Sequence, residues 1–251
     1  MNKPKLLDQV RTVAALRHLS PRTAEAYAQW IKRFILFHGK KHPLEMGAPE
    51  VHAFLSHLAQ ELNVSASTQN QALNAVAFLY HQVLGQEIGK IDEIPRARKP
   101  KRLPVVFAAG EVRNVLSHLS GLEHLMASLL YGSGLRLTEC TSLRVKDIDF
   151  TNRMIVVRSG KGGRDRTTML PHSCVPALER QVAEVMGILQ MDLTANFAGA
   201  TMPDSLVRKY PGASRQMAWQ YLFPASRRCV DPASGVVLMY KYDICRCHPC
   251  T

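Results

Sequence analysis

A run of prolines and basic residues interrupts the chain between residues 94 and 104. Proline removes a backbone donor and restricts the backbone, so neither a helix nor a strand is expected to pass through this stretch. We expect residues 85–104 to be a linker between two folding units. Its cations could lie along phosphates, where each contact releases a counterion, or they could simply be solvated. They are Arg96, Arg98, Lys99, Lys101 and Arg102.

Residues 1–84 have the apolar spacing of amphipathic helices. Ser20 followed by Pro21 is a typical helix start. Serine caps the first turn, and the N–H that proline lacks would have no partner within the helix at this position. Tyr27, Ile31 and Phe34 then follow at helical intervals. The same spacing recurs at 6–16, 51–62 and 73–84, so we expect a four-helix N-terminal domain with one small core.

Residues 105–237 begin with helical spacing and then change to the two-residue period of strands. The candidate strands are 147–150, 154–157 and 166–170, with turns at 151–153 and 159–163. Glycines in the second turn supply the positive φ that tight hairpins need. Helical spacing returns at 175–189. The chain is therefore predicted to be mainly α, with a small antiparallel β-sheet in its second domain.

The charge of the chain restricts its partners. The net charge is +12 over 251 residues, with a pI of about 9.7. Such an excess favours a polyanionic partner, either nucleic acid or an anionic membrane face, although the chain could also be a merely basic soluble protein. No apolar run reaches the ~18 residues that a membrane span needs, and the N-terminus has no apolar signal core. We therefore expect an intracellular protein with no place in a membrane.

Two cations are candidates for phosphate chemistry. Arg136 follows a small-residue break at 132–134 and opens a helix, where free N–H groups and a guanidinium could together hold a phosphate. Glu139, three residues later, could pair with Arg136 and orient it, or the two could form an ordinary surface pair. Lys161 lies at the tip of the glycine-flanked turn and could donate a proton to a leaving oxygen, or it could be a plain polar turn residue.

These features occur in an order that resembles the first half of a tyrosine recombinase catalytic domain. The matching stretches are Gly134–Glu139, Leu143, Val145–Asp149, Gly160–Arg166 and Leu170–Pro171. The N-terminal helices with Ser20–Thr23 and Tyr27 look like the core-binding domain of that family. The resemblance implies a C-shaped clamp around DNA and a tyrosine that forms a 3′-phosphotyrosyl bond, with no metal or nucleotide cofactor. It also implies charge stabilisation by Arg136, with Glu139 in support, and general acid catalysis by Lys161.

A later segment narrows the resemblance to the integron integrases. Leu206–Ala213, Trp219–Pro224 and Asp231–Val237 are similar to the insertion of that subfamily, which we place at about 191–224. The resemblance implies recombination of gene cassettes through folded single-stranded hairpins and duplex sites. It also implies a tetrameric synapse of identical chains and a location in the bacterial cytoplasm, in association with the nucleoid.

Several side chains are expected on the DNA. Trp219, Tyr221 and Pro232 could pack on unpaired bases, and a stack on an aromatic ring is worth ~1–3 kcal/mol. Trp219 and Tyr221 could instead be core residues. Arg22 and Arg164 lie within the matching stretches and would join the linker cations on phosphates.

The family pattern breaks off after Val237. It should continue with a His-x-x-Arg box, a second histidine or tryptophan, and the nucleophilic tyrosine, and residues 238–251 match none of these. We expect an incomplete catalytic domain at 105–237 and an aberrant tail at 238–251, as a frameshift or early stop would produce. Tyr240 and Tyr242 are poor candidates for the nucleophile, because a tyrosine hydroxyl needs positioned partners to activate it. The crowded cysteines of the tail would wrap a zinc ion poorly, so no metal site is expected.

Three hypotheses follow for the function. The chain is a site-specific recombinase of the integron type that is cut short, or a DNA-binding protein without strand transfer that competes passively at recombination sites. An unrelated basic helical protein, such as a regulator or a membrane-surface protein, is disfavoured by the combined motifs. A family-like continuation in another reading frame past codon 237 would support the frameshift, and its lack would contradict it.

Overall fold

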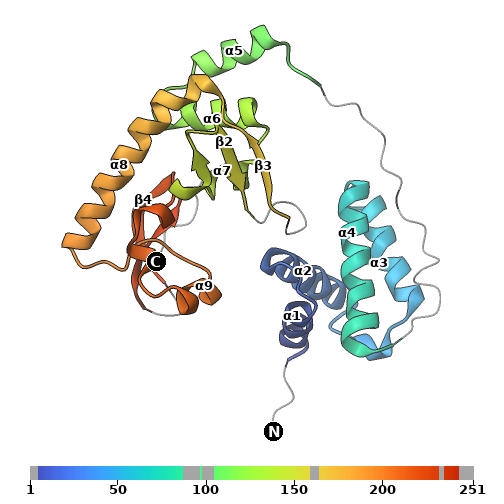
Figure 1. The fold of residues 1–251 in the computed structure, drawn as a ribbon. Helices are drawn as coiled ribbons and strands as arrows, with labels where there is room; N and C mark the ends of the chain where they lie inside the picture. The colour runs from blue at the N-terminus through green and yellow to red at the C-terminus, as the bar shows by residue number, and fades with distance from the viewer. Residues whose placement is uncertain (1–4, 87–96, 98–104, 159–163, 232–234, 243–251) are drawn as a thin grey trace. The chain divides into compact units, whose positions relative to one another are not determined.

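The computed structural model describes residues 5–86, 97, 105–158, 164–231 and 235–242. Two compact units divide the chain, Met1–Pro104 and Val105–Thr251. Figure 1 shows helices in the first unit and helices with small sheets in the second. Among the described residues, no helix is both long and apolar enough to cross a membrane.

The described part of the first unit consists of helices around two apolar clusters. Its elements are α1 (Leu6–Leu16), α2 (Pro21–Phe37), the short 3-10 turn η1 (Pro43–Glu45), α3 (Ala48–Gln60), α4 (Ala66–Phe78) and the π-helical end η2 (Leu79–Leu84). The expected start of α2 is confirmed, since Ser20 Oγ accepts a hydrogen bond from the Thr23 N–H at 3.1 Å.

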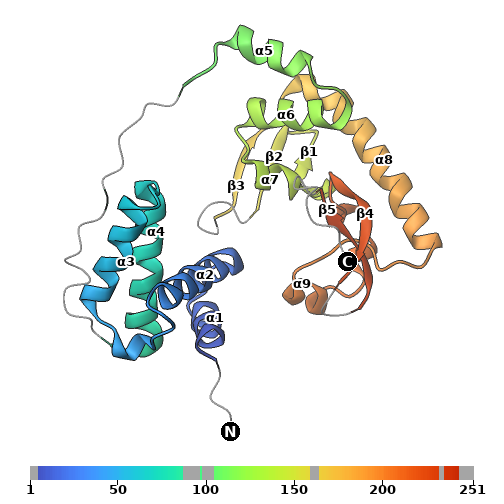
Figure 2. The ribbon, with the colours of Figure 1, turned by 180° about the vertical axis from the view of Figure 1, so that it is seen from behind.

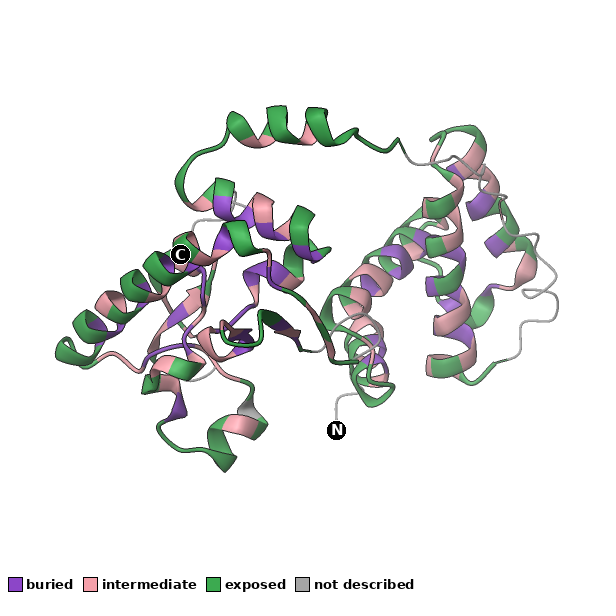
Figure 3. Cartoon of the chain, turned by 45° about the horizontal axis from the view of Figure 1, so that its top comes forward, coloured by how far each residue is buried: buried purple, intermediate pink, exposed green. Residues whose placement is uncertain are grey.

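The larger cluster of the first unit lies where α2, α3 and α4 pack together. Phe34, Val51 and Val76 are fully buried there. The ring of Tyr80 joins them, and its hydroxyl donates to the Pro43 carbonyl at 3.0 Å, so this buried polar group is satisfied. Figure 3 shows the buried positions of these helices on their facing sides.

The described part of the second unit mixes helices with two antiparallel sheets. Its helices are α5 (Ala109–Ser117), α6 (Gly121–Ser133), α7 (Leu137–Thr141), α8 (Val175–Thr194) and α9 (Asp204–Lys209), with 3-10 turns η3 (Val145–Asp147), η4 (His172–Cys174), η5 (Ala213–Arg215) and η6 (Met217–Trp219). The first sheet has the order β1 (Ile148–Asp149), β2 (Met154–Val157), β3 (Arg166–Met169). The second pairs β4 (Pro224–Val230) with β5 (Val237–Lys241).

The core of the second unit lies between the first sheet and the helices that accompany it. Leu129 of α6, Ile155 of β2 and Leu178 of α8 are fully buried in one cluster, which Leu222 and Phe223 complete from the segment before β4. Figure 2 shows α6, α7 and α8 around this sheet. The segment that resembled an insertion therefore supplies part of the core.

The predicted fold class is confirmed: the described chain is mainly helical with small antiparallel sheets. The strands expected near 147–150, 154–157 and 166–170 are β1, β2 and β3. The sheet of β4 and β5 was not expected. It carries the second unit past Val237, where we expected the domain to end, because Met239 of β5 is buried and the Tyr242 N–H donates to the Phe223 carbonyl at 2.8 Å.

Candidate functional site

The junction between α6 and α7 positions Arg136. α6 ends at Ser133, and Gly134 follows with a φ of +61°, a left-handed conformation that glycine adopts without steric cost. This turn ends α6, and α7 begins at Leu137, directly after Arg136. The Arg136 side chain is 55% exposed, so its guanidinium is accessible to a ligand.

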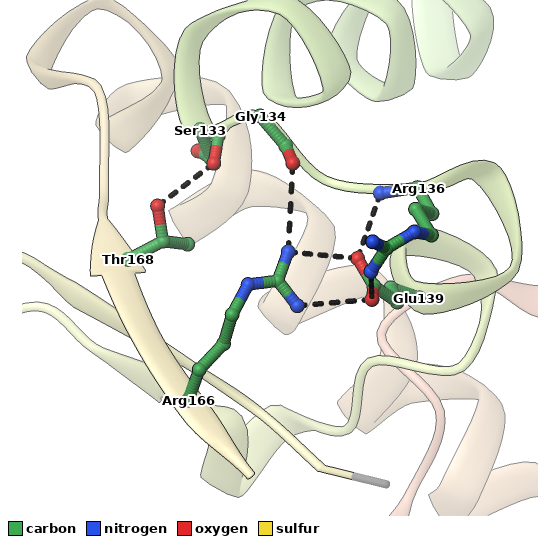
Figure 4. A network of polar contacts seen from close by, with 6 residues as sticks. All are labelled: Ser133, Gly134, Arg136, Glu139, Arg166 and Thr168. Atoms are coloured by element: carbon green, nitrogen blue, oxygen red, sulfur yellow. Dashed lines mark hydrogen bonds and ion pairs between the residues drawn. The ribbon is translucent and has the colours of Figure 1, made fainter. Parts of the chain in front are cut away.

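The carboxylate of Glu139 binds two arginines. Oε2 accepts the backbone N–H of Arg136 at 2.8 Å, and Oε1 accepts Nη1 of the same residue at 2.7 Å. Arg166, at the start of β3, donates Nη1 to Oε1 and Nη2 to Oε2, both at 2.9 Å (Figure 4). The second interaction is bidentate, the geometry in which an arginine binds a carboxylate most strongly. The expected pair of Arg136 and Glu139 is thus present, with Arg166 as a third member.

The charges of this network are fixed by its contacts. The hydrogen bond from Arg166, more than any other contact, lowers the pKa of Glu139 to about 2, and both the backbone and the side chain of Arg136 add to this. The same contact raises the pKa of Arg166. Two guanidinium groups therefore face one carboxylate, and the three groups carry a net positive charge that suits an anion.

β3 is attached to the α6–α7 junction at two points. Thr168 Oγ1 donates to the Ser133 carbonyl at 2.7 Å, and Arg166 Nη2 lies 3.5 Å from the Gly134 carbonyl oxygen (Figure 4). β3 is the strand that leaves the hairpin on which Lys161 was predicted to act. Lys161 itself lies outside the described residues, and Arg164, beside the hairpin, is exposed.

The buried carboxylate of Asp147 lies close to the end of β2, the other strand of this hairpin. Asp147 is 3% exposed and accepts hydrogen bonds from the Arg144 backbone N–H at 2.9 Å and from Arg158 Nε at 2.8 Å. Arg158 is the residue after β2. Lys146 lies close by, and burial, followed by the charge of Arg158, lowers its pKa. Arg144, Lys146 and Arg158 thus gather around a single buried acid at the end of β2 that precedes the hairpin turn.

Arg144 joins these cations to the segment that resembled an insertion. It is 9% exposed and donates Nη1 to the Trp219 carbonyl and Nη2 to the Thr201 carbonyl at 2.8 Å. Nη2 also lies 3.2 Å from the Tyr221 hydroxyl, and the guanidinium carbon is 4.3 Å from the centroid of that ring. Tyr221 is therefore engaged within the protein, which favours the core alternative for this residue.

Trp219 differs from Tyr221 because its ring is partly exposed. Lys146 Nζ lies 2.9 Å from the centroid of the indole ring, and the Tyr210 ring is 6.4 Å away. The Lys146 ammonium therefore makes a cation–π contact with one face of the indole ring.

The remaining predicted contacts are separate from this network or lie outside the described residues. Arg22 is exposed on α2. Residues outside the described part of the chain are Arg96, Arg98, Lys99, Lys101, Arg102 and Pro232, and also Cys245, Cys247 and Cys250. Of the linker, Ala97 is described: its N–H donates to Asn70 Oδ1 at 3.1 Å, and Asn70 Nδ2 donates to its carbonyl at 3.0 Å. Within the described residues, no group of three histidine, cysteine or acidic side chains could hold a metal ion.

Arg166 and Arg144 are site residues that sequence reasoning missed. Arg166 was part of a matching stretch but received no role, because its partner Glu139 is 27 residues away and no spacing rule links them. Arg144 follows Leu143 directly, and its contacts with residues 201, 219 and 221 depend on the folded chain. Arginine side chains are mostly exposed, so the sequence alone does not predict that Arg144 is buried.

Comparisons with known proteins find relatives along most of the chain. The family model described as "Phage integrase, N-terminal SAM-like domain" matches residues 6–90, and that described as "Phage integrase family" matches residues 109–197. An integrase/recombinase of Escherichia coli is 45% identical over 240 residues, which is 95% of this chain and 71% of the relative. The tyrosine recombinase XerA of Thermococcus kodakarensis is 30% identical over 178 residues, 68% of this chain and 59% of the relative.

A solved structure shares the fold at low sequence identity. The integrase of the transposon Tn1549, in complex with circular intermediate DNA, aligns with a TM-score of 0.54 and 14% identity. The alignment covers 89% of this chain and 72% of that one.

Proposed function

The chain belongs to the phage integrase family of tyrosine recombinases, which act in site-specific DNA recombination, and we propose that it binds the recombination sites of gene cassettes. The observation that carries this proposal is the network of Arg136, Glu139 and Arg166. It presents an accessible guanidinium with excess positive charge, held by a turn, a helix and a strand. A phosphate bound there would be stabilised as charge develops on it, which is the largest contribution in reactions of this kind.

The surface around Trp219 supports the integron type of substrate, a folded single strand with unpaired bases. The indole of Trp219 is partly exposed and carries Lys146 over one face, so a base would stack on its other face or displace the ammonium toward a phosphate. We propose Trp219 and Pro232 as base contacts. The proposed phosphate contacts are Arg22, Arg96, Arg98, Lys99, Lys101, Arg102 and Arg164. In the strand cleavage that the family carries out, Lys161 is proposed as the general acid for the departing 5′ oxygen.

Binding without strand transfer is the second candidate function. Among the 251 residues of the sequence, no histidine is followed by an arginine three positions later. The hydroxyls of Tyr240 and Tyr242 lie 3.4 Å from carboxylate oxygens of Asp231 and Glu123, which are not members of the Arg136 network. A tyrosine nucleophile has to be activated beside the groups that hold the phosphate. We therefore propose that the 251 residues of this chain, by themselves, bind DNA and form no phosphotyrosyl bond.

One adduct assay tests both candidate functions, DNA binding with strand transfer and DNA binding without it. The protein is mixed with a labelled cassette-site hairpin, and binding is measured before denaturation and covalent adduct after it. We expect binding without adduct. Because a hydrogen bond to a charged group is worth ~1.5–3 kcal/mol, Arg136→Ala should weaken binding by at least about ten-fold. The matched control is Arg180→Ala, which removes an exposed arginine from α8. An adduct would show that a tyrosine of this chain is a nucleophile, and unchanged binding by the Arg136 variant would contradict the phosphate site.

A further inference from the structure

We propose that Arg166 is a positioning residue that frees Arg136 for a DNA phosphate by holding the carboxylate of Glu139 in its place. The proposal rests on the proposed function, because it assumes that the ligand of Arg136 is a phosphate. It assigns to Arg166 a role in charge balance in addition to its place in the fold.

The contacts of the two arginines with Glu139 are unequal. Arg166 uses two guanidinium nitrogens, one on each carboxylate oxygen, whereas Arg136 uses one guanidinium nitrogen and its backbone N–H. Three of the four contacts on Glu139 therefore remain if the Arg136 side chain turns away. The Glu139 side chain is 7% exposed and that of Arg136 is 55% exposed, so the arginine can move toward a ligand while the carboxylate stays in place.

The charges give this asymmetry a consequence. With Arg136 and Glu139 alone, the carboxylate would neutralise the guanidinium and repel an approaching phosphate. With Arg166 added, the carboxylate is already neutralised, so a phosphate meets a net positive charge at Arg136. The contact with Arg166 is the largest cause of the low pKa of Glu139. This agrees with Arg166, and not Arg136, being the main partner of the carboxylate. Arg166 thus determines whether Glu139 supports Arg136 or competes with its ligand.

The position of Arg166 suits such a role. It opens β3, and Thr168 attaches the same strand to the end of α6 (Figure 4). The backbone of β3 pairs with β2 from residue 166 onward, since Val157 lies opposite Arg166. A substitution at Arg166 therefore removes the guanidinium while the strand pairing and the Thr168 hydrogen bond remain, which allows the charge to be tested apart from the fold.

Rescue by a second substitution is the decisive experiment. The affinity of each variant for the labelled hairpin is measured at one salt concentration. Arg166→Gln should weaken binding about ten-fold, because Glu139 then retains Arg136. The double variant Arg166→Gln with Glu139→Gln should bind within about three-fold of the unsubstituted chain, because the competing carboxylate is gone. A purely structural role predicts that the double variant binds no better than Arg166→Gln, and that result would overturn the proposal.

Two controls protect this test. Arg180→Gln removes the same charge at an exposed position of α8 and should leave affinity within about two-fold. Arg166→Lys keeps the charge with less of the geometry and should also bind within about three-fold; a ten-fold weakening in this variant, with a normal thermal transition, would overturn charge balance as the cause. If Arg136→Ala weakens binding and Arg166→Gln does not, the inference fails while the proposed function stands. If the unsubstituted chain does not bind the hairpin, the proposed function itself fails.

Discussion

The carboxylate of Glu139 meets two guanidinium groups and a backbone N–H at the turn between α6 and α7. A buried acid is stable only when its charge is compensated, and here each oxygen has two partners. The acid and not the exposed arginine is therefore the structural centre of the site. Its ionisation should stabilise both the network and the fold of the second unit.

The pH dependence of stability tests this role of Glu139. Its pKa is lowered from 4.5 to about 2 in the folded protein, so the ionised carboxylate stabilises the fold above pH 4.5, and this contribution disappears as the pH falls from 4.5 toward 2. The full shift corresponds to about 3.4 kcal/mol, and because solvent screens the two partly exposed guanidinium groups we expect a decrease on the order of 2 kcal/mol. Urea unfolding of the chain and of Glu139→Gln across this range measures it, with Glu184→Gln on α8 as the exposed control. Equal pH slopes for the chain and the Glu139 variant would show that this ion network contributes nothing to stability.

At the scale of elements, two arginines, Arg144 and Arg228, attach the segment after α8 to the rest of the second unit. Arg144 binds carbonyls of residues 201 and 219 from the start of η3. Arg228 of β4 binds Asp192 at the end of α8, and its guanidinium carbon lies 5.1 Å from the centroid of the Phe197 ring. Trp219 lies against Lys146, which is close to Arg158 at the end of β2.

Asp192→Asn should show how much the second of these contacts contributes. Asp192 is 1% exposed, so its replacement leaves the guanidinium of Arg228 without a counter-charge near the core. Breaking one partner of a buried pair costs ~3–5 kcal/mol, and since the Arg228 side chain is 32% exposed we expect a decrease of about 2 kcal/mol in the free energy of unfolding. Denaturant unfolding compared with Glu184→Gln on the same helix measures this. A decrease below about 0.5 kcal/mol, the scatter of surface changes, would mean that α8 and β4 are joined by other contacts.

The same elements show what the sequence can predict. α2 and β1 to β3 were predictable, because a Ser–Pro start and a turn rich in glycine are local signals. β4 was not, because four of its residues, Ser226, Arg227, Arg228 and Val230, are exposed and its apolar residues do not alternate. Arg136 and Glu139 were predictable from their spacing along one turn. Arg166 was not, because its partner lies across a helix–strand contact that forms only in the folded chain.

For the whole molecule, the net charge of +12 favours a polyanionic partner, and the five cations between residues 96 and 102 are part of this excess. Asn70 of α4 binds both backbone polar groups of Ala97, so the chain between the basic residues Arg96 and Arg98 is held against the first unit at this point. A backbone fixed in the middle of a basic stretch loses less entropy on binding than a free one. We therefore expect the linker to contribute to affinity for any DNA, independently of its sequence.

Salt dependence separates the linker from the two folded units. Replacing Arg98, Lys99, Lys101 and Arg102 together with glutamine should reduce the slope of log affinity against log salt by about 0.9 for each phosphate of duplex DNA that the linker no longer neutralises, and by about 0.7 on a single strand. A variant with Pro100→Ala and Pro104→Ala keeps all the cations and should keep the slope, which separates charge from chain stiffness. An unchanged slope in the glutamine variant would place the counterion release on the folded units. The cations around Arg136 and Trp219 would then have to account for the affinity.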